Sequence, residues 1–149
     1  MVVKETMHIL LYRAFHAQRN ILRPCMRQLG LGAGQPKIVV YLDEHGPCRQ
    51  RDLADYFEVD PAAISRMLES LEKGGFVTVA ADENHRRCNL VKATERGRQA
   101  GQAWLEKCAQ AEEIMLQGFA PEEREAFRDY LIRARDNFAN WREEHPCET

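Results

Sequence analysis

The stretch "RDLADYFEVDPAAISRMLESLEKGGFV", residues 51–77, contains two short helical patterns joined by the tight segment "EVDPA". In the first pattern Leu53 and Phe57 lie on one face, as in an amphipathic helix packed on a core. Asp60 then supplies an N-cap, and Pro61 follows at the first helical position of the second pattern. Two short helices joined by such a turn are typical of a helix-turn-helix.

The second helix of the pair has one apolar face and one face of small or polar residues. Ile64, Leu68 and Leu71 recur at helical spacing and are expected to face inward. Gly74 and Gly75 follow as the left-handed stop at the C-terminus. Small side chains on the other face allow close approach to a groove of DNA, and hydroxyl or guanidinium groups can donate to bases or phosphates. The outer-face residues are Ala62, Ala63, Ser65, Arg66, Glu69 and Ser70.

A hairpin is expected directly after this helix, because "FVTVAA" and "CNLVKAT" are two strand-like segments around a polar tip. The tip, within "DENHRRCNLVKATERG" at residues 82–97, has too little apolar material to fold into a core. Its position predicts the wing of a winged helix-turn-helix. Arg86 and Arg87 are expected along the minor groove or the phosphates, and Asp82 can hold an arginine through a bidentate pair.

A second interpretation of the same pattern stays open. Helix-turn-helix geometry also occurs in domains that bind only proteins, and an Arg-Arg pair at a hairpin tip is often a solvated turn. Asp60, Glu69 and Glu72 would repel phosphates if they faced them. A winged-helix module that mediates protein contacts is therefore the alternative to DNA binding.

Long helical patterns flank the central region. Residues 6–29 carry two adjacent apolar stripes, which indicate a wide buried surface, and Pro24 is expected to kink or restart this helix. A further helix is expected over about 35–44, with Pro36 in its first turn. Pro121 is expected to open the last helix, whose large apolar residues recur as in paired helices and need either the first helix or a second subunit as partner. These residues are Phe127, Leu131, Ala134, Phe138 and Trp141.

The composition fits one domain with or without a dimerising extension, at 149 residues, 44% hydrophobic and 30% charged. No apolar run approaches the roughly 18 residues that span a membrane, and a signal-peptide core is missing, so we expect a cytoplasmic protein. The net charge of −2 divides into +3 over residues 1–48, −1 over 49–97 and −4 over 98–149. Positive charge for a nucleic acid must therefore be concentrated by folding.

Over nearly its whole length the chain resembles the MarR (multiple antibiotic resistance regulator) family of transcription factors. Residues 51–77 resemble the family's helix-turn-helix, and residues 82–97 resemble its wing signature of an Asp, a second acid, two basic residues and a strand ending in Thr and Gly. The resemblance implies a homodimer with intertwined N- and C-terminal helices. It also implies that each subunit reads half of a palindromic operator in double-stranded DNA, most often as a repressor.

We therefore predict a mainly α winged helix-turn-helix fold with a small β-hairpin wing and N- and C-terminal dimerisation helices. Residues 1–34 and 98–149 are expected in the dimerisation domain, and 35–97 in the DNA-binding domain. The expected DNA contacts are Arg51, Pro61, Ala62, Ala63, Ser65, Arg66, Asp82, His85, Arg86 and Arg87. The expected dimer contacts are Leu11, Phe15, Phe127, Leu131, Phe138 and Trp141.

Two positions depart from the family pattern. His85 stands where a second acid is usual, so Asp82 is expected to orient the wing arginines largely alone. Glu58 stands in the turn where a glycine is common, so a less tight turn is expected. Both departures make a simple copy of the family's DNA contacts doubtful.

A small effector is also implied, because members of the family often bind aromatic or phenolic acids between the dimerisation helices and the winged domain. Arg13, His16 and Arg19 on the first helix are candidates to meet such an anion. The alternative is that these three residues lie on the surface or in the dimer contact.

Thiol, metal and enzyme chemistry have weaker signals. Some relatives sense peroxides through a cysteine early in the first helix, where "MHILLYRAF" has none; Cys25, flanked by arginines, is the alternative thiol. The five cysteines lack a CxxC spacing and are expected to be free.

His45-x-x-Cys48 and His85-x-x-Cys88 resemble metal-ligand spacing but fall in different parts of the fold, so no metal site is expected. No catalytic triad or phosphate loop is recognisable, so neither an enzyme activity nor a cofactor is expected.

Overall fold

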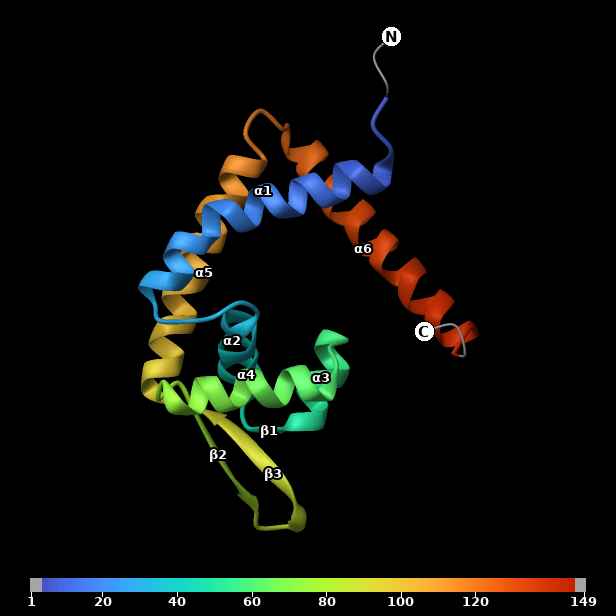
Figure 1. Ribbon diagram of the computed structural model, residues 1–149. Helices are drawn as coiled ribbons and strands as arrows, with labels where there is room; N and C mark the ends of the chain where they lie inside the picture. The colour runs from blue at the N-terminus through green and yellow to red at the C-terminus, as the bar shows by residue number, and fades with distance from the viewer. Residues whose placement is uncertain (1–3, 147–149) are drawn as a thin grey trace. The chain divides into compact units, whose positions relative to one another are not determined.

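The computed structural model describes residues 4–146, with only the backbone described at Arg86 and Arg87. The chain order of elements is α1 (Met7–Gln28), α2 (Gln35–His45), β1 (Cys48–Arg49), α3 (Gln50–Phe57), α4 (Pro61–Lys73), β2 (Val77–Asp82), β3 (His85–Ala93), α5 (Glu95–Met115) and α6 (Pro121–Glu144) (Figure 1). This is a mainly α fold with a β-hairpin wing, so the predicted fold class is confirmed.

The chain forms two compact units, the first ending at Ala111 and the second beginning at Glu112. The predicted domain boundaries at residues 34 and 97 stay a prediction. No helix among residues 4–146 is both long enough and apolar enough to span a membrane.

The core of the first unit lies between α2, α3, α4 and the small sheet. Ile38 of α2 and Leu53 of α3 are completely buried there. From α4, Ile64, Leu68 and Leu71 enter the same core, as their spacing predicts. These three residues define the buried face of α4, and Met67 packs against the edge of the same core.

Local signals in the sequence account for most helix ends. Asp60 caps α4 through its carboxylate, which accepts a hydrogen bond from the backbone N–H of Ala62 at 2.8 Å. Gly75, with φ +77°, adopts the left-handed conformation after α4. Helix α1 continues through Pro24 without a restart, and Leu29 N donates to Cys25 O at 3.0 Å beyond it. Of the expected kink or restart, the restart is therefore wrong, because hydrogen bonds on both sides of a proline can hold a helix together. The kink stays a prediction.

The sheet is antiparallel, with strand order β1-β3-β2. In the hairpin, Val77 pairs with Ala93, and the register continues to Ala81 opposite Asn89. The register then shifts, so that Asp82 lies opposite His85 at the end of the wing. Strand β1 pairs only with Val91 and Leu90 of β3, at the base of the hairpin. The outer half of the wing therefore extends beyond the third strand.

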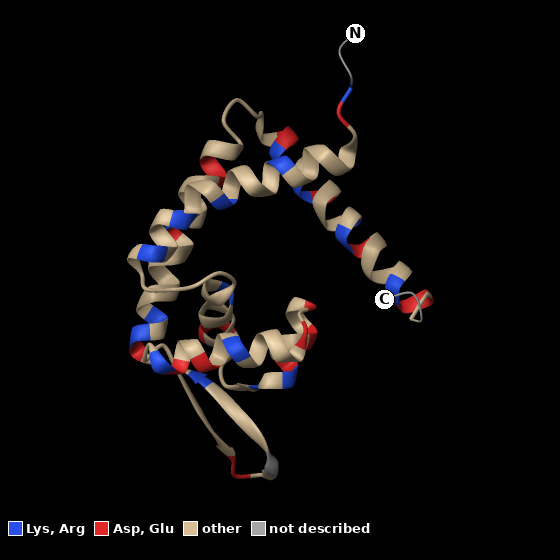
Figure 2. Cartoon of the chain, viewed as in Figure 1, with Lys and Arg blue, Asp and Glu red and all other residues tan. Residues whose placement is uncertain are grey.

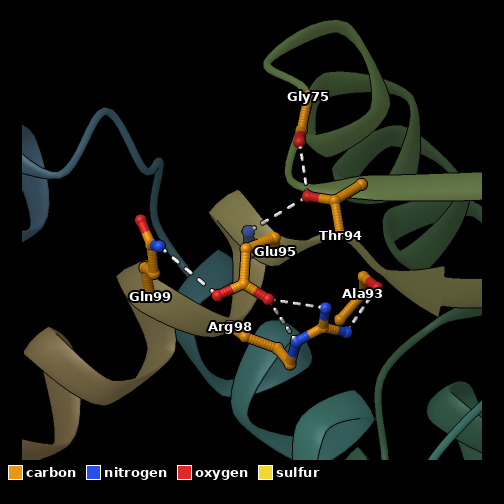
Figure 3. A network of polar contacts seen from close by, with 7 residues as sticks. Gly75, Ala93, Thr94, Glu95, Arg98 and Gln99 are labelled. Atoms are coloured by element: carbon orange, nitrogen blue, oxygen red, sulfur yellow. Dashed lines mark hydrogen bonds and ion pairs between the residues drawn. The ribbon is translucent and has the colours of Figure 1, made fainter.

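Thr94 joins the wing to α5 (Figure 3). Its hydroxyl donates to the carbonyl oxygen of Gly75 at 2.6 Å and accepts from the N–H of Gly97 at 3.1 Å. The N–H of Thr94 donates to the carbonyl oxygen of Phe76 at 3.0 Å. A Cβ on Gly97 would lie 2.1 Å from that same oxygen, so only glycine fits there.

An ion pair lies on the first turn of α5. Arg98 Nη2 donates to Glu95 Oε2 at 2.7 Å (Figure 3). The hydrogen bond to Arg98, together with its positive charge, lowers the pKa of Glu95. Because Glu95 is exposed and Arg98 is partly exposed, we assign this pair to the local order of the helix start.

The second unit comprises the end of α5, the connecting loop and α6. Arg124 of α6 donates to Glu113 Oε1 at 2.9 Å and to the carbonyl oxygen of Leu116 at 3.3 Å. The rings of Phe119 and Phe127 lie 5.9 Å apart between centroids. No residue of α6 is buried, and Phe127 is half-buried.

Candidate nucleic-acid interface

The outer face of α4 presents the residues expected from the sequence. Pro61, Ala62, Ser65 and Arg66 are exposed, and Ala63 is half-buried. The first two turns of the helix are therefore lined by small side chains with one guanidinium, a surface that can approach a groove closely.

The turn between α3 and α4 closes at Glu58, which has φ 52° and ψ 45°. It is the one residue other than glycine with positive φ among those that the structure describes. The N–H of Val59 donates to the carbonyl oxygen of Ala54 at 3.1 Å, which completes the C-terminal cap of α3. The expectation of a less tight turn is wrong, because Glu58 itself takes the left-handed conformation.

We expect Glu58→Gly to raise the free energy of unfolding by roughly 0.5–1 kcal/mol, because glycine takes this conformation without steric cost but loses more freedom on folding. Urea unfolding followed by circular dichroism measures the change. Glu58→Ala is the matched control, since it removes the same charge and retains the Cβ. Equal stability of the glycine and alanine variants would show that the backbone at residue 58 is not strained.

The acids that counted against DNA binding have local partners. Asp60 caps α4, as described above. Glu69 pairs with Lys73 one turn later, at 3.4 Å. Glu72 Oε2 accepts from the N–H of Val79 at 3.0 Å, which joins α4 to the wing. Figure 2 shows acidic and basic residues interspersed along α4. Repulsion of phosphates by these carboxylates is therefore reduced.

At the wing, Asp82 pairs with a residue that sequence reasoning missed. Arg49 Nη2 lies 3.4 Å from Asp82 Oδ2 and 3.0 Å from His85 Nδ1. Asp82 Oδ1 accepts from the N–H of Asn84 at 3.0 Å, which shapes the tip. The signal that could have found Arg49 is its place directly before α3, where a hydrogen-bond acceptor is preferred and arginine cannot serve as one.

The other expected DNA contacts are less constrained. Arg51 on α3 is exposed, and its Nε lies 3.7 Å from Asp55 Oδ2. The side chains of Arg86 and Arg87 lie outside the described part of the structure. The expected pairing of Asp82 with these two arginines therefore stays a prediction.

A cavity of about 500 Å³ opens between α1, α2 and α5 in the first unit. Arg19 lines it, and its guanidinium carbon lies 5.7 Å from the ring centroid of Phe15. The other effector candidates are elsewhere: Arg13 pairs with Glu5, and the ring of His16 lies 4.3 Å from that of Tyr12. Sequence reasoning missed most of the lining residues, because α1, α2 and α5 bring them together only in the fold. Among them are Arg23, Lys37 and Trp104.

The apolar residues expected at a dimer contact are largely exposed in the single chain. Leu11 and Phe15 on α1 are 56% and 54% exposed. On α6, Leu131, Phe138 and Trp141 are 44%, 68% and 45% exposed. Phe127 differs, because it is half-buried against Phe119 within its own unit.

Cys48, Cys108 and His45 each lie against neighbouring groups. Burial raises the pKa of Cys48 to about 11, and burial followed by the neighbouring Cys25 raises that of Cys108. His45 stacks on Tyr41 at 4.1 Å between ring centroids. Within residues 4–146, no three or more Asp, Glu, His or Cys side chains gather as metal ligands. Free thiols are found at Cys25, Cys48, Cys88 and Cys108.

A capped helix pair, a β-hairpin after its second helix and a short third strand define a winged helix-turn-helix protein. A model of the MarR family matches residues 31–89. YxaD of Bacillus subtilis (strain 168), an uncharacterised HTH-type transcriptional regulator, is 32% identical over 97 residues, which cover 65% of this chain and 68% of YxaD. The chain belongs to the MarR family of transcriptional regulators.

Two solved structures extend the comparison. One is a Listeria monocytogenes protein described as a MarR family transcriptional regulator, solved in complex with a 26-mer DNA. Its TM-score is 0.82 at 25% identity, and the match covers 93% of this chain and 91% of the Listeria chain. BpsR of Bordetella bronchiseptica, whose DNA binding is regulated by 6-hydroxynicotinic acid, has a TM-score of 0.78 at 26% identity. That match covers 89% of this chain and 94% of BpsR.

Proposed function

We propose that the protein binds a palindromic operator as a homodimer and represses transcription until a small aromatic acid releases it. The observation that carries the DNA-binding part is the exposed first half of α4, with Ala62, Ser65 and Arg66 on its surface, beside a wing joined to it through Glu72. The DNA complex of the Listeria relative supports this part, because that protein has the same fold.

Self-association is supported by the exposed apolar side chains of α1 and α6. Phe15, Phe138 and Trp141 each expose about half or more of their surface, and large exposed apolar side chains on one element mark interaction surfaces. A homodimer buries them and supplies two copies of α4, as two half-sites of a palindrome require. Leu11 and Leu131 extend the same surfaces.

A shift assay with DNA flanking the protein's own gene tests DNA binding. If the protein contacts six to ten phosphates, raising the salt concentration from 50 to 200 mM should lower its affinity for DNA by roughly 10³–10⁵-fold. Half-sites separated by one helical turn should bind best, because the dimer is two-fold symmetric. Absence of binding at low salt to flanking and unrelated DNA alike would contradict the proposal and favour a protein-binding module.

The effector is proposed for the 500 Å³ cavity, where Arg19, Arg23 and Lys37 offer positive charge and Phe15 and Trp104 offer aromatic surface. An aromatic carboxylate suits this chemistry, and the aromatic acid that regulates BpsR supports the choice. In Trp141→Phe protein, Trp104 is the one remaining tryptophan of two. Titration with 6-hydroxynicotinate should change its fluorescence and release DNA. An equal response to the uncharged amide, the matched control ligand, would contradict the role of the basic residues.

A further inference from the structure

Arg49 occupies the N-cap position of α3 without capping it. The preferred residues there accept a hydrogen bond from the helix, whereas a guanidinium has donors only. Asp52 compensates, because its Oδ2 accepts from the N–H of Arg49 at 2.9 Å. The Arg49 side chain instead reaches the end of the wing, 33 residues further along the chain at Asp82.

Arg49 also contacts His85 at the end of the wing. Arg49 Nη2 lies 3.0 Å from His85 Nδ1 and can only donate, so Nδ1 is the acceptor in a hydrogen bond between them. The carboxylate of Asp82, whose side chain is 12% exposed, receives the same guanidinium group. One arginine thus joins both residues that face each other across the end of the hairpin.

This contact lies where the backbone of the wing has least support. Strand β1 pairs with Val91 and Leu90 only, and Glu72 holds β2 at Val79. Both supports lie on the inner half of the hairpin. Arg49 adds a support at Asp82 and His85, one residue from the start of α3. Arg49 therefore links the outer half of the wing to the start of α3.

We propose that Arg49 is a positioning residue for DNA binding, which holds the wing at the angle that DNA requires through its contacts with Asp82 and His85. The proposal rests on the DNA binding proposed above. Arg49 itself does not contact phosphate. Its effect is to restrict the wing before DNA arrives, which removes an ordering cost from binding.

Arg49→Ser tests the proposal, because serine is a good N-cap and leaves α3 intact. We expect the dissociation constant for operator DNA to rise threefold to fivefold at pH 8, roughly the effect of a partly exposed ion pair. The dependence on salt should not change, and thermal stability should not fall. Arg51→Ser is the matched control: loss of a phosphate contact should lower the salt slope by about 0.9.

The energetic coupling between Arg49 and its two acceptors supplies a second test. In Asp82→Ala/His85→Ala protein, which lacks both acceptors, Arg49→Ser should have no further effect on binding. Unchanged affinity of Arg49→Ser, a reduced salt slope or a full effect without the acceptors each overturns the proposal. Failure of the wild type to bind any DNA would instead overturn the proposed function.

Discussion

Gly97→Ala is expected to lower the free energy of unfolding by about 3 kcal/mol, at the upper end of the usual penalty for overpacking. The added Cβ would lie 2.1 Å from the carbonyl oxygen of Phe76. That oxygen accepts from the N–H of Thr94 at 3.0 Å, so it cannot withdraw without breaking the junction of wing and helix. The midpoint of thermal unfolding should fall by roughly 6–12 °C.

Gly101→Ala, one turn further along α5, is the matched control. Its Cβ would lie 3.6 Å from Val40 Cγ2, an ordinary contact distance. Alanine is favoured over glycine inside a helix by roughly 1 kcal/mol, so this variant should be as stable as wild type or more stable. Denaturant unfolding of both proteins separates steric overlap from helix propensity. A Gly97→Ala protein as stable as wild type would show that the backbone around Phe76 can shift to accommodate the added Cβ at little cost.

Phe138→Ala is expected to weaken self-association by roughly 30-fold or more, the effect of removing a central aromatic contact from an interface. Phe138 is 68% exposed in the single chain. Its removal therefore costs little within α6, and the loss should appear in the dimerisation constant measured by sedimentation equilibrium.

Asn137→Ala is the control on the same helix, because residue 137 lies off the apolar stripe that contains Leu131, Phe138 and Trp141. It should associate as the wild type does. A wild-type protein that sediments as a 17.2 kDa monomer at micromolar concentration would rule out the proposed homodimer. Equal dimerisation constants for wild type and Phe138→Ala would remove α6 from the interface.

The sequence by itself determined the helix pair, the cap at Asp60 and the wing that follows. Each of these depends on neighbours within a few residues: an acceptor before a proline, an apolar residue every third or fourth position, and a glycine stop. Ile64, Leu68 and Leu71 are buried as that spacing predicts. Local patterns are sufficient here because the free energy of a cap or an amphipathic face arises within one element.

Only the tertiary structure decided what surrounds those elements. Glu58 looked unsuited to its turn, yet the cap bond from Val59 holds it in the left-handed conformation. The cavity joins Arg19 of α1 to Trp104 of α5, which no spacing along the chain connects.

The partner of Asp82 could not be predicted from the sequence either, because Arg49 lies 33 residues earlier in the chain. Sequence reasoning paired the Asp82 carboxylate with arginines of its own hairpin, because a sequence pattern indicates contacts only between residues that are close along the chain. The long arginine side chain crosses from the start of α3 only because β1 sets that residue beside β3, where Arg49 pairs with Leu90. Contacts of this kind depend on strand register and side-chain reach, which are properties of the folded chain.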